Sequence, residues 1–253
     1  MDECYVTVTI PRIPAENLKI SKDYSVINVE QQDTITATYG PDNTTDSLTW
    51  SSSDESVATV DDGVITAIAS GSCTITAAIG NLTASCNVNV PYYFGDQEFA
   101  YEVFDEINRV REENGLHAYE WDERIGNVGA KIVAAYNVMT GTNASDYANH
   151  AGQIGIGIGG DIDDAREVVQ TWLDSPMHRG TILDPDPDVQ TGFVAVARKS
   201  LDKEKGLVRG TSIIFDQGAS KEYLDTLDWT NPSLINVMPQ VDRNKIQQYL
   251  SIY

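Results

Sequence analysis

The sequence predicts two domains in succession, an all-β sandwich followed by an α+β domain. From about residue 5 to residue 90, short alternating or β-branched segments are separated by turn clusters. Near Pro91 and Gly95 the hydrophobic period changes from two residues to about 3.6. Beyond that point helical patterns come first and alternating strands follow, which is the order typical of an α+β layered domain.

Charge and hydropathy narrow the classes of partner. The chain of 253 residues has a formal net charge of −21, with 38 acidic and 17 basic side chains. Both parts are acidic, and such surfaces repel nucleic acid and anionic lipid headgroups. The sequence contains no apolar run of transmembrane length, so we expect no membrane-spanning segment.

The first domain reads as seven short strands, which is typical of an antiparallel sandwich. Turn clusters such as "GPDNTTD", "SSSDES" and "DDG" separate them. The expected strands cover residues 6–10, 33–39, 47–50, 57–60, 64–68, 73–79 and 84–90.

Side-chain alternation places two cysteines in the core of this sandwich. Cys73 and Cys86 both fall on the apolar face of their strands. Gly80-Asn81 reads as a two-residue hairpin turn, which sets Ile75 opposite Cys86 and leaves Cys73 diagonal to it. A diagonal pair is poor disulfide geometry, so we expect two buried thiols, although a β-bulge would shift this register.

The segment "LTWSSSDESVATVDDGVITAIASGSCTITAAIGNLTASCNVNV", residues 48–90, resembles the group 2 bacterial immunoglobulin-like domain. The resemblance implies an immunoglobulin-like sandwich that serves as a spacer or an adhesion module in a surface or secreted bacterial protein. Because the segment shows no cluster of ligand-type residues, we expect a spacer.

The second domain opens with three helical patterns. The first places Phe99, Val103, Ile107 and Val110 on one face and ends at Asn114-Gly115. The second covers about residues 122–139. The third covers about residues 163–173, with Asp161 or Asp163 as its N-cap. Strands are expected at 191–198 and 211–217, joined by a polar hairpin loop.

A G-x-G-x-x-G spacing occurs at Gly155, Gly157 and Gly160. A dinucleotide-binding loop would need a preceding strand and a surrounding βαβ unit, and the polar run "TGTNASDYANHAG" precedes these glycines instead. The glycines alternate with isoleucines, so we predict an extended segment whose bare face allows close approach of another backbone.

Residues 99 to about 217 resemble the CAP superfamily, which includes the cysteine-rich secretory, antigen 5 and pathogenesis-related-1 proteins. The stretch "EVFDEINRVREENGLHAYEWDERIGNVGAKIVAAY" matches the opening helices, and "VVQTWLDSPMHRGTILDPDPDVQTGFVAVA" carries the W-x-x-S-P-x-H-R-x-x-I-L signature. The resemblance implies a three-layer α-β-α sandwich with a cleft across one face, in a secreted or surface-attached protein.

The same resemblance points to four residues of the cleft. Many members hold two histidines and two acidic residues there, in some around a divalent cation. His178 matches the second histidine, and His150 is the candidate for the first. Gln153 stands near the place of one glutamate and Ser175 at the place of the other. Arg179, which follows His178, is expected to anchor the turn through hydrogen bonds. His117 is expected to be a solvated turn residue, and "DPDPDV" at residues 184–189 is expected to form a turn rather than a calcium site.

These replacements weaken the chemistry of the cleft. One imidazole and an amide bind a divalent ion poorly, so we expect no cofactor; a divalent cation held by His178 and His150 is the alternative. A general base needs a neighbouring charge to tune its pKa, which Gln153 does not supply. Ser175 and His178, separated by Pro176, do not make a triad, and the Ser-Pro pair is expected to end the preceding helix.

The sequence therefore predicts residues 1–91 as the immunoglobulin-like domain, 92–98 as a linker and 99–218 as the CAP-like domain. Residues 219–253 are too apolar for a free tail and are expected to pack on the second domain. The favoured function is that of an extracellular or cell-surface protein that binds a small molecule, peptide, glycan or surface protein. The alternatives are a metal-assisted hydrolase or peptidase using His178, and a structural cell-wall-associated module.

Overall fold

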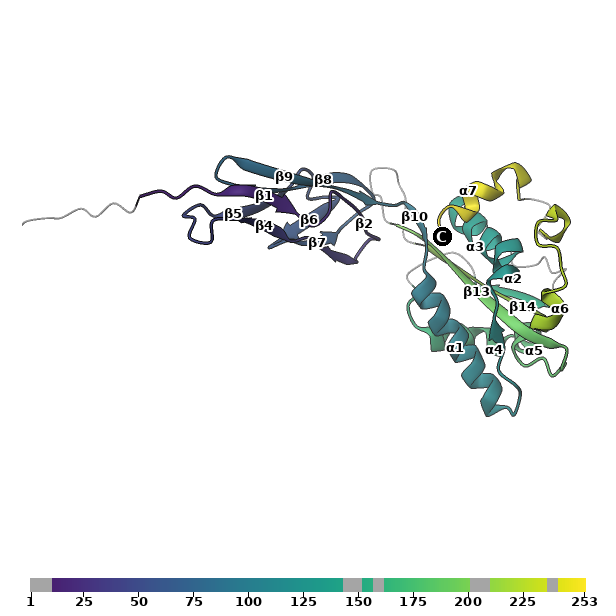
Figure 1. The fold of residues 1–253 in the computed structure, drawn as a ribbon. Coiled ribbons are helices and arrows are strands. Elements are labelled where there is room, and N and C mark those ends of the chain that lie inside the picture. Colours follow the sequence, from purple (N-terminus) through teal and green to yellow (C-terminus); the bar gives the residue numbers. More distant parts are fainter. Residues whose placement is uncertain (1–10, 143–151, 157–161, 201–209, 236–240) are drawn as a thin grey trace, which may run out of the picture. The chain divides into compact units, whose positions relative to one another are not determined.

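The computed structural model describes residues 11–142, 152–156, 162–200, 210–235 and 241–253 (Figure 1). Its backbone contacts divide the chain into two compact units, residues 1–92 and 93–253. The prediction of a strand at residues 6–10 falls outside the described residues.

The first unit is a strand-rich sandwich, as predicted. One sheet has the order β2-β9-β8-β5, a second has the order β3-β7-β6, and β1 pairs with β4. The predicted strand at 33–39 is divided into β3 and β4. The strands are β1 (Glu16–Ile20), β2 (Tyr24–Val26), β3 (Gln32–Thr34), β4 (Ala37–Gly40), β5 (Leu48–Ser52), β6 (Ala58–Asp61), β7 (Val64–Ala67), β8 (Gly71–Ile79) and β9 (Leu82–Val90).

The β8–β9 hairpin has the predicted register. Ile75 lies opposite Cys86, and Cys73 lies opposite Val88. Both cysteines are buried free thiols in the core, and burial is the largest cause that raises their pKa values. Gly80 adopts a left-handed φ of 58° in the two-residue turn, a conformation that glycine accepts without steric cost.

The second unit is built on one sheet in the order β10-β13-β14-β12, with β11 pairing in parallel with β13. The two long strands form the predicted antiparallel hairpin, with Lys199 opposite Gly210. The strands are β10 (Tyr93–Gly95), β11 (Glu120–Trp121), β12 (Gly152–Ile156), β13 (Val189–Lys199) and β14 (Gly210–Ala219).

One helical layer covers the first face of this sheet. It contains α1 (Gln97–Glu113), α4 (Ala165–Asp174) and α5 (Pro176–Ile182). All four residues predicted on the inner face of α1 are buried, and α1 ends before Asn114 and Gly115 as predicted. Trp172 of α4 is fully buried against the same face. The apolar stripe of each helix therefore packs on the sheet.

The N-cap of α4 is Asp164, so the prediction of Asp161 or Asp163 was wrong. The Asp164 carboxylate accepts hydrogen bonds from the amides of Arg166 and Glu167. The helix begins at Ala165, and a capping carboxylate acts from the residue directly before the first helical one. Asp163 instead forms an ion pair with Arg198 at 3.1 Å.

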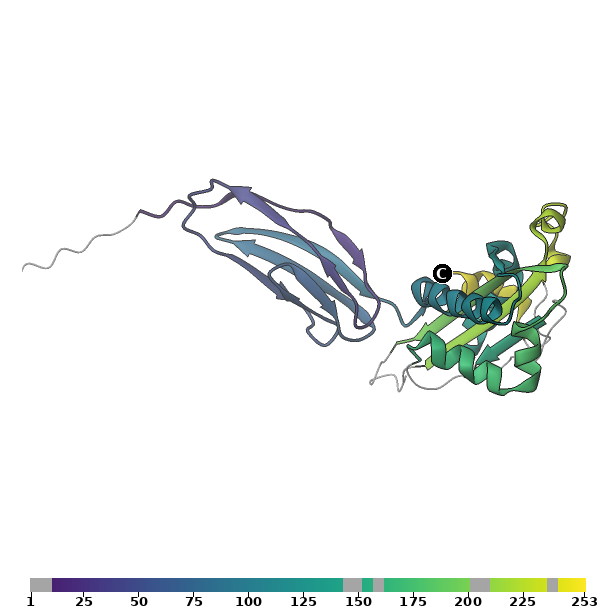
Figure 2. The same ribbon diagram turned by 90° about the horizontal axis from the view of Figure 1, so that it is seen from below.

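A second helical layer covers the opposite face and completes the three-layer α-β-α sandwich (Figure 2). The single helix predicted over 122–139 is broken at Gly129 into α2 (Glu123–Val128) and α3 (Ala130–Thr140). Gly129 has φ −145° and ψ −85°, far from helical values, so the backbone hydrogen-bond pattern is interrupted there.

The C-terminal residues belong to this second layer. They include α6 (Lys221–Leu224), two short 3₁₀ turns at Pro232–Leu234 and Arg243–Lys245, and α7 (Ile246–Leu250). Leu224, Val241, Ile246 and Tyr249 are buried in the same apolar cluster as the inner face of α3. Residues 221–235 and 241–253 thus cover an apolar surface of α3 that would otherwise face water.

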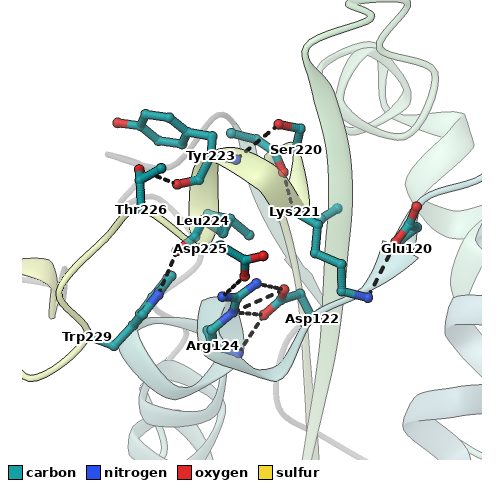
Figure 3. A network of polar contacts seen from close by, with 12 residues as sticks. Glu120, Asp122, Arg124, Ser220, Lys221, Tyr223, Leu224, Asp225, Thr226 and Trp229 are labelled. Atoms are coloured by element: carbon teal, nitrogen blue, oxygen red, sulfur yellow. Dashed lines mark hydrogen bonds and ion pairs between the residues drawn. The ribbon is translucent and has the colours of Figure 1, made fainter.

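A network of polar contacts fastens this C-terminal segment to α2 (Figure 3). Arg124 of α2 contacts Asp122 and Asp225, each at 2.6 Å. The Arg124 guanidinium also lies over the Trp229 ring, whose indole nitrogen donates to the backbone oxygen of Leu224 at 2.9 Å. The shared guanidinium connects the start of α2 to the chain that follows α6.

Two segments predicted without regular pairing are strands. Residues 92–98 are not simply a linker, because β10 pairs with β13 and Asp96 caps α1. Three residues are too few to show an alternating pattern, so the sequence did not predict β10. The glycine-rich segment is extended as predicted over residues 152–156, where β12 pairs antiparallel with β14. Gly157 and Gly160 lie outside the described residues.

We predict that the core thiols react only after unfolding. The Cys4→Ser variant removes the third cysteine of the chain. In this variant, Cys73 and Cys86 should resist an aromatic disulfide reagent in native buffer, because both are buried and burial raises their thiol pKa values. In denaturant the reagent should count 2 thiols. Rapid native reaction, or no thiols in denaturant, would contradict the arrangement.

A methyl group added at Gly126 should destabilise the second unit. A Cβ there would stand 2.4 Å from the Phe193 ring, a buried side chain on β13 with no room to move. We expect Gly126→Ala to cost about 1–3 kcal/mol of unfolding free energy, measured by urea denaturation. The matched control is Gly180→Ala, where nothing lies within 4 Å; an equal loss in both variants would refute the argument.

Candidate functional site

The junction of α4 and α5 positions the candidate site. Ser175 ends α4 as predicted, because Pro176 follows it and occupies the first position of α5. The Ser175 carbonyl accepts from the Arg179 amide at 2.8 Å, and its amide donates to the Trp172 carbonyl at 3.1 Å. The buried Trp172 ring anchors this turn on the sheet, so Ser175 acts through its backbone.

His178 lies in the middle of α5 and is half-buried. Among the described residues, its ring makes no side-chain hydrogen bond or ion pair, with Ser175 or with a carboxylate. Its neighbour Met177 is 68% exposed. Arg179 donates from Nε to the backbone oxygen of Leu173 at 2.6 Å, which is the anchoring role that the sequence predicted. The described surroundings of His178 therefore supply no orienting partner for acid–base chemistry.

The other predicted cleft residues are placed only in part. Gln153 lies in β12, where its backbone is opposite Asp216 of β14. Helix α5 contacts β12, so the strand of Gln153 and the helix of His178 are neighbours. His150 lies outside the described residues, and its relation to His178 stays a prediction. Within the described residues, no group of three or more His, Cys, Asp or Glu side chains is arranged to hold a metal ion.

A buried arginine holds α5 in place. Arg111 of α1 is fully buried, and its guanidinium donates to the backbone oxygens of His117, Ile182 and Asp184 at 2.8, 2.6 and 3.2 Å. Two of these acceptors belong to the chain directly after His178, at the end of α5. Burial lowers the pKa of Arg111 below its ordinary value, as expected for a cation removed from water.

Tyr119 extends this network to the sheet. Its hydroxyl accepts from Arg111 at 2.7 Å and donates to the side-chain oxygen of Gln217 at 3.1 Å. Gln217 of β14 in turn donates to Asp184 at 2.9 Å. The Arg111 guanidinium also lies 3.6 Å from the centre of the Tyr119 ring. Burial is the main cause that raises the pKa of Tyr119, which keeps its hydroxyl protonated.

One signal in the sequence could have identified Arg111 as a residue that supports the site. Arg111 stands four residues after Ile107, on the buried face of α1, where a basic residue needs buried acceptors. His117 behaves as predicted for a turn residue: it is exposed, and its Nε2 lies 3.0 Å from the backbone oxygen of Val189. The "DPDPDV" run forms the predicted turn, in which Asp184 and Asp186 accept from amides two residues ahead.

We predict that Arg111→Lys destabilises the second unit and loosens α5. A lysine presents one point charge and cannot reach three backbone oxygens and a hydroxyl at once. The expected cost is about 2–4 kcal/mol in urea unfolding, with faster amide exchange at residues 181–184. The matched control is the exposed Arg166→Lys, which should change stability by less than about 0.5 kcal/mol. Equal effects of both variants would show that the buried network is not what holds α5.

Comparison with known proteins matches each unit to a family. Residues 14–88 match the bacterial Ig-like domain (group 2), and residues 104–191 match the cysteine-rich secretory protein family. An uncharacterized protein of Clostridium acetobutylicum is 44% identical over 81 residues. That match covers 30% of this chain and only 8% of the relative's length.

Two solved structures that align with parts of this chain come from other bacteria. An extracellular protein containing an SCP domain, from Bacillus anthracis, is 15% identical with a TM-score of 0.33, over 48% of this chain and 41% of that one. An outer surface protein of Borrelia burgdorferi is 18% identical with a TM-score of 0.36, over 49% of this chain and 95% of that one. The two matched regions are thus similar, in chain order, to a group 2 bacterial Ig-like domain and to a domain of the cysteine-rich secretory protein family.

Proposed function

We propose that the second unit is a binding module that holds an extracellular ligand beside α5 and β12 without transforming it. The succession of an Ig-like domain and a CAP domain fits a surface-associated protein. Among the described residues, no helix is both long enough and apolar enough to cross a bilayer. The acidic surface disfavours nucleic acid and anionic lipid as ligands. The remaining classes are a small molecule, a peptide, a glycan or another surface protein.

The observation that carries this proposal is the isolation of the His178 ring. Catalysis by an imidazole needs an orienting hydrogen bond or a nearby charge, and a metal site needs further ligands. The described residues around His178 offer neither, whereas a half-buried ring beside the exposed Met177 offers apolar contact and one hydrogen-bonding edge. Such a surface suits binding, because it keeps a ligand without activating water or a nucleophile.

Metal titration distinguishes this proposal from the metal-assisted hydrolase. We expect the full chain to bind Zn²⁺ no tighter than about 0.1 mM in calorimetry, and His178→Ala to leave that isotherm unchanged, because a single imidazole is a weak site. Hydrolysis of a fluorescent casein should stay at the background rate in both proteins. Tight binding of zinc, or casein hydrolysis that His178→Ala abolishes, would overturn the proposal.

Binding itself can be tested with soluble fragments of bacterial peptidoglycan and with short synthetic peptides. At least one of these probes should raise the melting temperature of the full chain, and His178→Ala should remove the rise, since bound ligand stabilises only the folded state. His117→Ala is the matched control, because that exposed histidine lies on the turn after α1. A rise that both variants keep would place the ligand elsewhere, and no rise with any probe would contradict a binding module for these ligands.

A further inference from the structure

The side chains that the strands β2, β9, β8 and β5 present on the outer face of their sheet are uncharged. None of the residues in these four strands is Asp, Glu, Lys or Arg, although such residues make up 22% of the chain. The side chains that alternate with the buried core residues form what we call the neutral face. Its members are Tyr24, Val26, Thr49, Ser51, Ser72, Thr74, Thr76, Ala78, Thr83, Ser85, Asn87 and Asn89.

Hydrogen bonds between neighbouring strands arrange the polar groups of this face. The hydroxyl of Thr74 donates to the side-chain oxygen of Asn87 at 3.4 Å, and that of Ser72 donates to Asn89 at 3.2 Å. The side-chain nitrogens of both asparagines have no hydrogen-bond partner among the described residues. The two amides are therefore held by their oxygens while their N–H groups stay available for a ligand.

An aromatic ring stands beside these amides. Tyr24 is 56% exposed and lies directly opposite Asn87 across the β2–β9 pair. Val26 is 57% exposed and lies opposite Asn89 in the same way. One row of paired residues crosses β2, β9 and β8. It consists of the Tyr24 ring, the Asn87 side-chain amide and the Thr74 hydroxyl. The second row, Val26, Asn89 and Ser72, repeats the order with an aliphatic side chain.

We propose that the neutral face binds an uncharged polysaccharide chain. A sugar ring has C–H faces that pack on an aromatic ring and hydroxyl groups that pair with amides and hydroxyls. The missing charges argue against a charged partner, which would leave its own charges unpaired on this surface. Apart from the small Ala78, the apolar side chains of this face stand at the β2 edge, whereas the centre of a protein–protein interface is richer in apolar groups.

The dimensions also suit an extended ligand. Strands β8 and β9 each contain 9 residues and therefore run about 30 Å, the length of several sugar units. The face is preorganised, because it lies on paired strands and consists of small side chains that lose little conformational entropy. This proposal concerns the first unit alone and does not depend on the ligand of the second.

Titration of the full chain with neutral oligosaccharides tests the proposal. The probes are cellohexaose, chitohexaose and mannohexaose, followed by calorimetry, with an oligogalacturonate of similar length as the anionic comparison. At least one neutral probe should bind saturably below about 10 mM, and Tyr24→Ala and Asn87→Ala should each weaken it about tenfold. The matched control is Tyr39→Ala, an exposed tyrosine on β4 outside this sheet, which should bind like the unchanged chain.

Several outcomes would overturn the inference. They are no binding of any neutral hexasaccharide, equally tight binding of the anionic probe, or the same loss of affinity in Tyr39→Ala. Sedimentation of each protein gives a further check: if the full chain self-associates and Tyr24→Ala abolishes this, the face is an interface between copies. Thermal melting of the three variants establishes that each is folded, because all the changed side chains are solvent-facing.

Discussion

The buried guanidinium of Arg111 is the interaction on which the candidate site depends. A cation removed from water needs acceptors for its donors. Here three backbone oxygens and the Tyr119 hydroxyl accept from Nε and Nη1, whereas the buried Nη2 has no partner among the described residues. Two of the oxygens lie at the end of α5, so the helix that carries His178 is held through its carboxyl end. The position of the proposed binding surface thus follows from the burial of one charged side chain on another helix.

Long periodic segments were predictable because their burial is repeated along the chain. The inner face of α1, the β8–β9 hairpin and the β13–β14 hairpin all follow from alternation or helical spacing. The Ile75–Cys86 register followed from one tight turn. Short or interrupted elements could not be predicted from the sequence. Strand β10 is too short to show a pattern. The apolar spacing continues unchanged across the helix break at Gly129, so it gives no sign of the break.

The sequence identified residues of the candidate site, but not the contacts that hold the site together. Sequence spacing placed Ser175 at the helix junction and gave Arg179 its anchoring role, since both depend on local geometry. The contacts of Arg111 with Ile182 and Asp184 join residues that are about seventy positions apart, and no local pattern encodes such a meeting. The resemblance to the CAP superfamily pointed to His150 and His178 as cleft residues. The structure adds that Arg111 of α1 supports α5, the helix that carries His178.

The hydrogen bond between the Gly95 amide and the Ile252 carbonyl, at 2.8 Å, brings the first strand of the second unit beside its last residues. The Tyr253 ring leaves no space for a side chain at residue 95, where an added Cβ would stand 2.1 Å away. Tension applied between residues 95 and 252 would load this contact first rather than the long central hairpin. The two ends of the second unit are thus fastened to each other through β10, which is itself paired with β13.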